Sequence, residues 1–259
     1  MVEKLKLLGK SQRLRLLLKS LLLGAASFLF WRGRSGGGLS VILFLAFGAF
    51  LYLRPLFNAT RLLRSFLVFI ILSIFARELY ISIGVGDLFS GAAAFWGGIY
   101  PLASILIFYV TFGLKEYVLV RRQFWHFFLF AALFYQITFT YFLAEAAGFV
   151  SVVAVIVPAI LVFLIFSELI EIESRAARPA ALLSAGVFSL IFVEGLFVVQ
   201  FLPIGFFNAV NIVALGGLFF GELALHFYNG SLGKKILVSR LAILAVLACA
   251  IFLTSKWGL

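Results

Sequence analysis

The sequence predicts an all-α protein, a polytopic transmembrane helical bundle, from three observations. Of its 259 residues, 64% are hydrophobic and only 12% are charged, whereas an ordinary soluble domain is about half apolar and about a quarter charged. Long uncharged runs recur from one end of the chain to the other, which is typical of membrane-crossing helices. The 33 phenylalanines favour bulky lipid-facing and inter-helix packing over a water-filled β-barrel lumen.

The N-terminal region, residues 1–60, combines positive charge with one hydrophobic hairpin. The basic side chains of residues 1–38 are Lys4, Lys6, Lys10, Arg13, Arg15, Lys19, Arg32 and Arg34. One interpretation is a basic arm that lies on the anionic lipid headgroups of the cytoplasmic leaflet. The alternative is a signal-anchor span over 14–31, which a shorter apolar run at 39–53 follows.

Residues 61–259 predict a seven-span transmembrane core. The apolar runs are 65–83, 92–114, 124–143, 148–170, 180–204, 206–228 and 238–254. Each is close to the length of about 20 residues that a helix needs to cross the hydrocarbon core. A tight turn at Pro203-Ile204-Gly205 joins the fifth run to the sixth, and Gly216-Gly217 predicts close contact between helices.

Loop charges predict the orientation of these spans. The loops at 54–64, 115–123, 171–179 and 229–240 are basic, whereas the turns at 84–91, 144–147 and 203–205 hold no Lys or Arg. Because Lys and Arg accumulate in cytoplasmic loops, we expect the basic loops inside and the C-terminus outside the plasma (cytoplasmic) membrane. This orientation accounts for the net charge of +11, so the expected partner is the lipid bilayer and no nucleic acid is expected.

The same rule constrains the N-terminal hairpin. If the basic arm is cytoplasmic, an even number of crossings must precede Arg54. The runs 14–31 and 39–53 therefore either both cross, which makes nine spans, or both stay at the surface, which leaves seven. Two crossings are favoured, because irregular lipid-exposed backbone is unfavourable.

Glu194 is the strongest candidate for a functional residue, because it lies near the middle of the run 180–204. A lone ionised carboxylate at that depth is costly, so we expect it to face the bundle interior, where it is protonated or paired. It then acts either in proton or cation coupling, or as a neutral glutamate that hydrogen-bonds a neighbouring helix.

Other polar side chains lie in the same pair of runs. Glu222 and His226 are spaced i, i+4 on one helix face, as a proton-shuttling pair, as metal ligands or as a solvated interfacial pair. A metal normally needs three or more protein ligands, so no metal and no cofactor is predicted. Gln200, Asn208 and Asn211 either line a cavity or hold helices together by hydrogen bonds.

Four candidates lie in earlier runs. Arg77 and Glu78 are neighbours in one span, and because adjacent residues point apart on a helix, we expect them to have different partners. Glu168 ends a span before a basic loop, which is typical of a solvated salt-bridge cluster. The other histidine of the chain, His126, lies at the start of another span.

Three functions fit these residues. The first is a small transporter or permease-like protein that uses the intramembrane carboxylates. The second is a structural or assembly subunit of a larger membrane complex, with partner membrane subunits on its Phe-rich faces. The third and least favoured is an enzyme for a lipid-linked substrate, around His126, Glu168, Glu222 and His226. A water-accessible cavity at Glu194 would favour transport, and a solid core with an apolar outer patch would favour a subunit.

Overall fold

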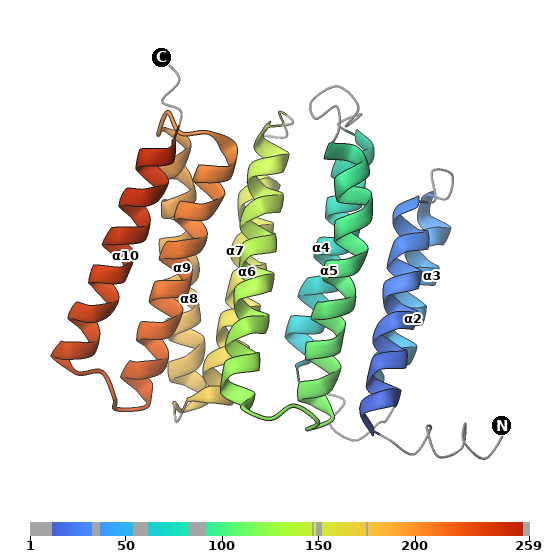
Figure 1. Cartoon of the computed structure of the whole chain (residues 1–259), viewed down its shortest axis with the longest axis horizontal. Helices are drawn as coiled ribbons and strands as arrows, with labels where there is room; N and C mark the ends of the chain where they lie inside the picture. The colour runs from blue at the N-terminus through green and yellow to red at the C-terminus, as the bar shows by residue number, and fades with distance from the viewer. Residues whose placement is uncertain are drawn as a thin grey trace. The chain divides into compact units, whose positions relative to one another are not determined.

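A computed structural model describes residues 12–32, 37–53, 62–82, 92–146, 148, 152–174 and 176–255. All regular structure in these ranges is α-helical, and Figure 1 shows the helices. They are α2 (Gln12–Arg32), α3 (Gly37–Leu53), α4 (Leu63–Ser82), α5 (Ala92–Lys115), α6 (Arg122–Ala146), α7 (Val152–Glu173), α8 (Arg178–Gln200), α9 (Phe206–Tyr228) and α10 (Lys234–Thr254). A helix forms over every predicted apolar run, which confirms the all-α class. Lys4, Lys6, Lys10, Arg34, Arg54 and the turn 84–91 lie outside the described residues.

Six of the described helices are long and apolar enough to cross a membrane. They are Gln12–Trp31, Arg122–Glu145, Val155–Glu173, Arg178–Gln200, Phe206–Tyr228 and Lys234–Thr254. Two shorter apolar helices, Gly38–Leu53 and Leu102–Lys115, accompany them. The helices are compatible with a membrane protein, and the total of seven or nine spans remains a prediction.

The chain divides into two compact units, residues 1–129 and 130–259. In the first unit α2 packs along α5 and α3, and α3 contacts α4. A Cβ added at Gly24 of α2 would lie 2.1 Å from Ile105, so α2 and α5 approach closely. Aromatic rings from α3, α4 and α5 form the core beside this contact: Tyr52, Phe66, Phe69, Phe108 and Phe112.

The second unit is built on α7, α8 and α9, with α10 packed against α9. Its core is a cluster of phenylalanine rings from α6, α7 and α8: Phe130, Phe134, Phe166, Phe188 and Phe192. A Cβ at Gly217 of α9 would lie 2.1 Å from Phe134, whereas a Cβ at Gly216 would meet nothing within 4 Å. The predicted close contact is therefore made by Gly217 alone of this pair.

The α8–α9 hairpin closes where the sequence predicts. α8 begins with a proline in its first turn, ends at Gln200, and α9 starts at Phe206 after the turn that contains Pro203. Proline fits the first helical turn because that turn has no intrahelical acceptor for its N–H. α10 lies at the edge of the unit and has no buried residue. Its surface is therefore left to lipid or to another protein.

Candidate functional site

The candidate site is the outer face of α8, which contains Glu194. The structure places this side chain on the exposed side of the helix. Within the described residues it forms no hydrogen bond and no ion pair, and the prediction that Glu194 faces the bundle interior is wrong. It also lies nearer one end than expected, because α8 ends at Gln200, six residues further on, about 9 Å away at 1.5 Å per residue.

Helix geometry explains why Glu194 points outward. The buried residues of α8 form one stripe that packs toward α7 and α9: Ala181, Ala185, Phe188, Ser189, Phe192, Leu196 and Val199. Residues two positions apart point about 200° apart around an α-helix, so Glu194 lies almost opposite both Phe192 and Leu196. Packing of the aromatic stripe inward therefore turns the carboxylate outward.

Apolar side chains surround the carboxylate on this outer face. Exposed residues on either side of Glu194 are Leu183 (72% exposed), Val187 (50%), Leu190 (67%), Phe197 (44%) and Phe201 (85%). Together with Glu194 they make a row that we call the α8 seam. The only other charged residue of α8 is Arg178, at its first position. The α8 seam is thus an apolar surface with one acidic group within it.

The amide side chains of α8 and α9 join helices of the second unit to one another. Gln200 Nε2 donates to the hydroxyl of Tyr141 at 2.6 Å, and the Tyr135 hydroxyl donates to Asn211 Oδ1 at 3.3 Å. Asn208 Nδ2 donates to the hydroxyl of Ser255 at 2.9 Å. Of the two interpretations of these amides, the structure supports hydrogen bonding between helices.

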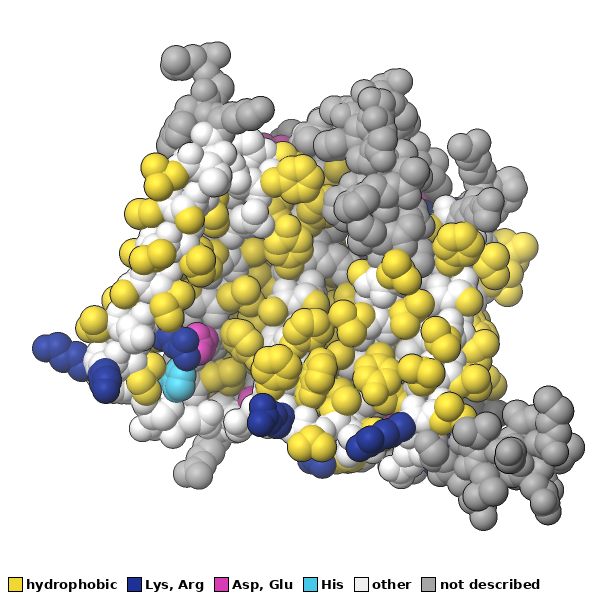
Figure 2. All heavy atoms as spheres, viewed as in Figure 1, with side chains coloured by type: hydrophobic (Ala, Val, Ile, Leu, Met, Phe, Trp, Pro, Cys, Tyr) yellow, Lys and Arg dark blue, Asp and Glu magenta, His cyan; other side chains and the backbone are white. Residues whose placement is uncertain are grey.

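Glu222 and His226 lie together near the C-terminal end of α9. Glu222 Oε1 is 3.9 Å from His226 Nε2 and 2.7 Å from Arg240 Nη2 of α10. Figure 2 shows this end of α9 and α10, where Lys and Arg side chains gather beside acidic and histidine groups below a largely hydrophobic surface. The predicted shared face of Glu222 and His226 is confirmed, and both side chains are about a third exposed, at 31% and 28%. Arg240 is the partner that helical spacing does not reveal.

Arg77 and Glu78 pair with each other, so the prediction of different partners is wrong for these neighbours. Arg77 Nη1 lies 2.8 Å from Glu78 Oε1, since two long side chains can meet although neighbouring positions point about 100° apart on a helix. Arg77 Nε also donates to the Phe30 carbonyl at 2.8 Å, and the guanidinium lies 4.5 Å from the Phe30 ring centre. Arg77 is buried and Glu78 is half exposed, so this charge is satisfied inside its own unit.

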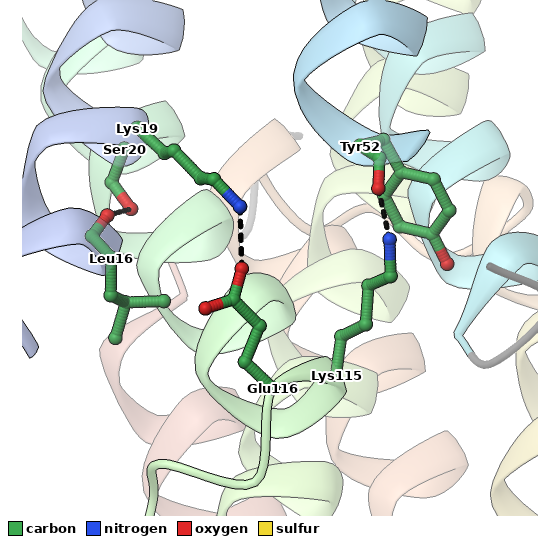
Figure 3. A network of polar contacts seen from close by, with 6 residues as sticks. All are labelled: Leu16, Lys19, Ser20, Tyr52, Lys115 and Glu116. Carbon is green, nitrogen blue, oxygen red and sulfur yellow. Dashed lines mark hydrogen bonds and ion pairs between the residues drawn. The ribbon is translucent and has the colours of Figure 1, made fainter. Parts of the chain in front are cut away.

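A second polar network of the first unit was not predicted from the sequence. Lys19 Nζ of α2 forms an ion pair with Glu116, just after α5, at 2.5 Å. The neighbouring Lys115 donates to the backbone carbonyl of Tyr52 at the end of α3 and lies over the Tyr52 ring. Figure 3 shows these contacts between three segments of the unit. Lys19 inside a leucine-rich run was the available signal, because a lysine there needs an acceptor.

The remaining candidates are buried. His126 is 4% exposed and Glu168 is 6% exposed. His126 belongs to the first unit and Glu168 to the second, with Glu222 and His226. Among the described residues no three His, Cys, Asp or Glu side chains are grouped as metal ligands.

Comparison with known proteins returns no match to a protein family, to a curated protein or to a solved structure.

Proposed function

We propose that this chain is a structural or assembly subunit of a larger membrane complex, and that the α8 seam is its docking surface. The observation that carries the proposal is the exposed Glu194 within that apolar row. An acidic side chain that faces lipid at the centre of a membrane helix costs about 3 kcal/mol, and Glu194, six residues from the end of α8, bears part of that cost. A partner that covers the seam and satisfies the carboxylate removes this cost.

The transporter or permease-like function has weaker support. It relied on Glu194 inside the bundle, whereas the carboxylate lies on the outside of α8. Gln200, Asn208 and Asn211 bind other side chains of the same unit. Such pairs stabilise helix packing, whereas a transport pathway needs polar groups that can bind cargo.

The enzyme function is also less well supported. Of its four residues, Glu222 and His226 are adjacent, and Arg240 already binds the Glu222 carboxylate. A general base must reach the proton that it removes, and this pair has an arginine in competition for the same oxygen.

We propose further that the basic loops face the cytoplasm of the plasma membrane, with nine spans and the C-terminus outside. Contacts within each unit support this topology. In the second unit Asn229 Nδ2 donates to the Glu173 carbonyl at 3.3 Å, so the two basic loops on either side of α8 and α9 share one end. In the first unit the Lys19–Glu116 and Lys115–Tyr52 contacts likewise join the start of α2 to the ends of α3 and α5.

Site-specific photocrosslinking in native membranes tests the subunit function. A photoreactive residue replaces Leu190 on the α8 seam, and the matched control replaces Val246 on α10, since both side chains are 67% exposed. We expect the probe at Leu190 to form a discrete adduct with one partner protein, and we expect that protein to copurify with the full chain at a fixed ratio in mild detergent. The probe at Val246 should label lipid. Lipid labelling at both positions would show that the seam has no protein partner.

A further inference from the structure

The charge on the α8 seam identifies the chemistry of its partner. Building on the proposed subunit function, we infer that the seam binds a membrane helix of another protein that carries a lysine or arginine at the depth of Glu194. Three observations support this inference. Two concern α8, namely the spacing of the seam and the open space beside Glu194. The third is the absence of a matching cation among the described residues of the chain.

The spacing of the seam is that of a helix–helix interface. Its members alternate at intervals of four and three residues: Leu183, Val187, Leu190, Glu194, Phe197 and Phe201. A 4-3 repeat keeps one face of a helix against a partner helix over several turns and supplies side chains for knobs-into-holes packing. An elongated helix therefore fits this surface better than a globular domain does.

Glycines beside the seam leave room for close approach. A Cβ added at Gly186 or Gly195 would meet nothing within 4 Å, so both glycines face open space. Gly195 follows Glu194 directly, so the carboxylate lies next to a position that has no side chain. Small residues let membrane helices approach until their polar side chains form hydrogen bonds.

The distribution of cations argues for a different protein over a second copy. Two copies share one orientation in the membrane, so a symmetric α8–α8 contact places Glu194 against Glu194, which like-charge repulsion disfavours. The exposed cations described by the structure, Arg13, Arg178 and Lys234 among them, lie near helix ends. Arg77 is inside its helix but is buried and paired. A basic side chain on another protein is the complementary group.

Synthetic helices in lipid vesicles test this charge requirement directly. The full chain is reconstituted with fluorescent Leu/Ala peptides of about 20 residues, which carry one lysine about 9 Å from the end that aligns with the α8–α9 turn. The control peptides carry leucine or glutamate at that position. Energy transfer should show about tenfold tighter association of the lysine peptide than of the leucine peptide, as expected of one strong interhelical polar contact.

Three variants separate the charge from the apolar surface. Glu194→Leu should remove the preference for lysine and leave the leucine peptide unaffected, and Glu194→Lys should transfer the preference to the glutamate peptide. The double variant Glu194→Leu/Leu190→Glu moves the carboxyl by one helical turn, so the best lysine position should move by about 6 Å. Because both sites are exposed, all three should fold, which circular dichroism and thermal melting check.

The outcomes separate this inference from the proposed subunit function. Equal association of the lysine and leucine peptides with the wild-type chain would overturn the cationic partner. Self-association of the chain that Glu194→Leu abolishes would make a second copy the occupant, and would also overturn it. In either case, a fixed-ratio protein adduct at Leu190 would leave the subunit function standing, so each proposal fails on a different measurement.

Discussion

Arg77 and Glu194 are both charged residues within apolar helices, and the two units of the chain satisfy them differently. Arg77 of the first unit is 2% exposed and has a carbonyl, a carboxylate and an aromatic ring as partners. Glu194 of the second unit is exposed, with apolar neighbours along its helix. An intramembrane charge is thus evidence for a binding surface only when the chain's own residues leave it unsatisfied.

The cores of the two units differ in the same way. The first unit includes cations in its interior: Lys115 is 2% exposed and binds the Tyr52 carbonyl. Among the described residues of the second unit, the arginines and lysines lie in the first two turns of α8 and α10, and the interior is a phenylalanine cluster with glycines against it and one buried carboxyl group, that of Glu168. Polar anchoring should therefore matter more in the first unit, and close aromatic packing more in the second.

Removal of Arg77 should produce the largest effect. Arg77→Leu takes away the guanidinium that binds the Phe30 carbonyl and the Glu78 carboxylate, with loss of the contact to the Phe30 ring. We expect a decrease of about 3 kcal/mol in the free energy of unfolding, because a hydrogen bond to a charged group contributes about 1.5–3 kcal/mol and the cation–π contact adds to it. Denaturant unfolding of the full chain in detergent measures it.

The matched control is the partner carboxylate. Glu78 is 53% exposed, so Glu78→Gln should cost less than about 1 kcal/mol, as is typical of an exposed member of an ion pair. If Arg77→Leu cost no more than Glu78→Gln, the buried cation would contribute little, and the difference between the units would disappear.

Addition of a methyl group at Gly217 should produce the next largest loss of stability. A Cβ at this position would lie 2.1 Å from Phe134, whose ring is itself enclosed by Phe188 and Phe192. Because the ring has no space to move into, Gly217→Ala should cost about 2 kcal/mol, as overpacking of a dense core does. Thermal melting of the purified chain would show the loss as a lower midpoint.

The adjacent glycine supplies the control for this variant. Gly216 faces open space, so Gly216→Ala should be neutral or stabilise the helix by up to about 1 kcal/mol through helix propensity. Equal melting midpoints for the two variants would mean that the α6–α9 contact adjusts freely, contrary to a closely packed aromatic core.

Sequence reasoning could predict where the helices lie, because that information is local. Each apolar run is bounded by charged or turn-forming residues, and the α8–α9 turn at Pro203 falls where a proline prevents the helix from continuing. Helix length and composition are likewise sufficient to identify six helices that can cross a membrane. These features need no knowledge of which helices are neighbours.

The face of each helix could not be predicted, and this is why Glu194 was misplaced. α8 carries large apolar residues on both sides, with Phe188 and Phe192 buried and Leu183 and Leu190 exposed. A helix that is apolar all round has no periodicity that marks its inner side. The expectation that an acidic residue turns inward assumed that the chain satisfies its own charges, and partners such as Arg240 and Glu116 are visible only in the tertiary structure.

The smallest predicted effect distinguishes the ion pairs of the two units. Lys19 and Glu116 are 19% and 12% exposed, whereas Arg240 and Glu222 are 40% and 31% exposed. Water screens the second pair more strongly, so double-mutant cycles should give a coupling energy of about 1–2 kcal/mol for Lys19–Glu116 and below about 1 kcal/mol for Arg240–Glu222. The cycles use Lys19→Met with Glu116→Gln, and Arg240→Met with Glu222→Gln.

The salt dependence of the two coupling energies tests this last comparison more strictly. Added salt shortens the Debye length to about 3 Å at 1 M and so weakens interactions between exposed charges, whereas partly buried pairs are screened much less. The Arg240–Glu222 coupling should therefore fall toward zero at high salt while most of the Lys19–Glu116 coupling persists. The methionine replacements retain the apolar stems of Lys19 and Arg240, so lost packing contributes little to either cycle. A coupling at Arg240–Glu222 that matches Lys19–Glu116 and resists salt would mean that the end of α9 is shielded from water. The second unit would then protect an ion pair from water as the first does, and the exposed Glu194 would be its exception.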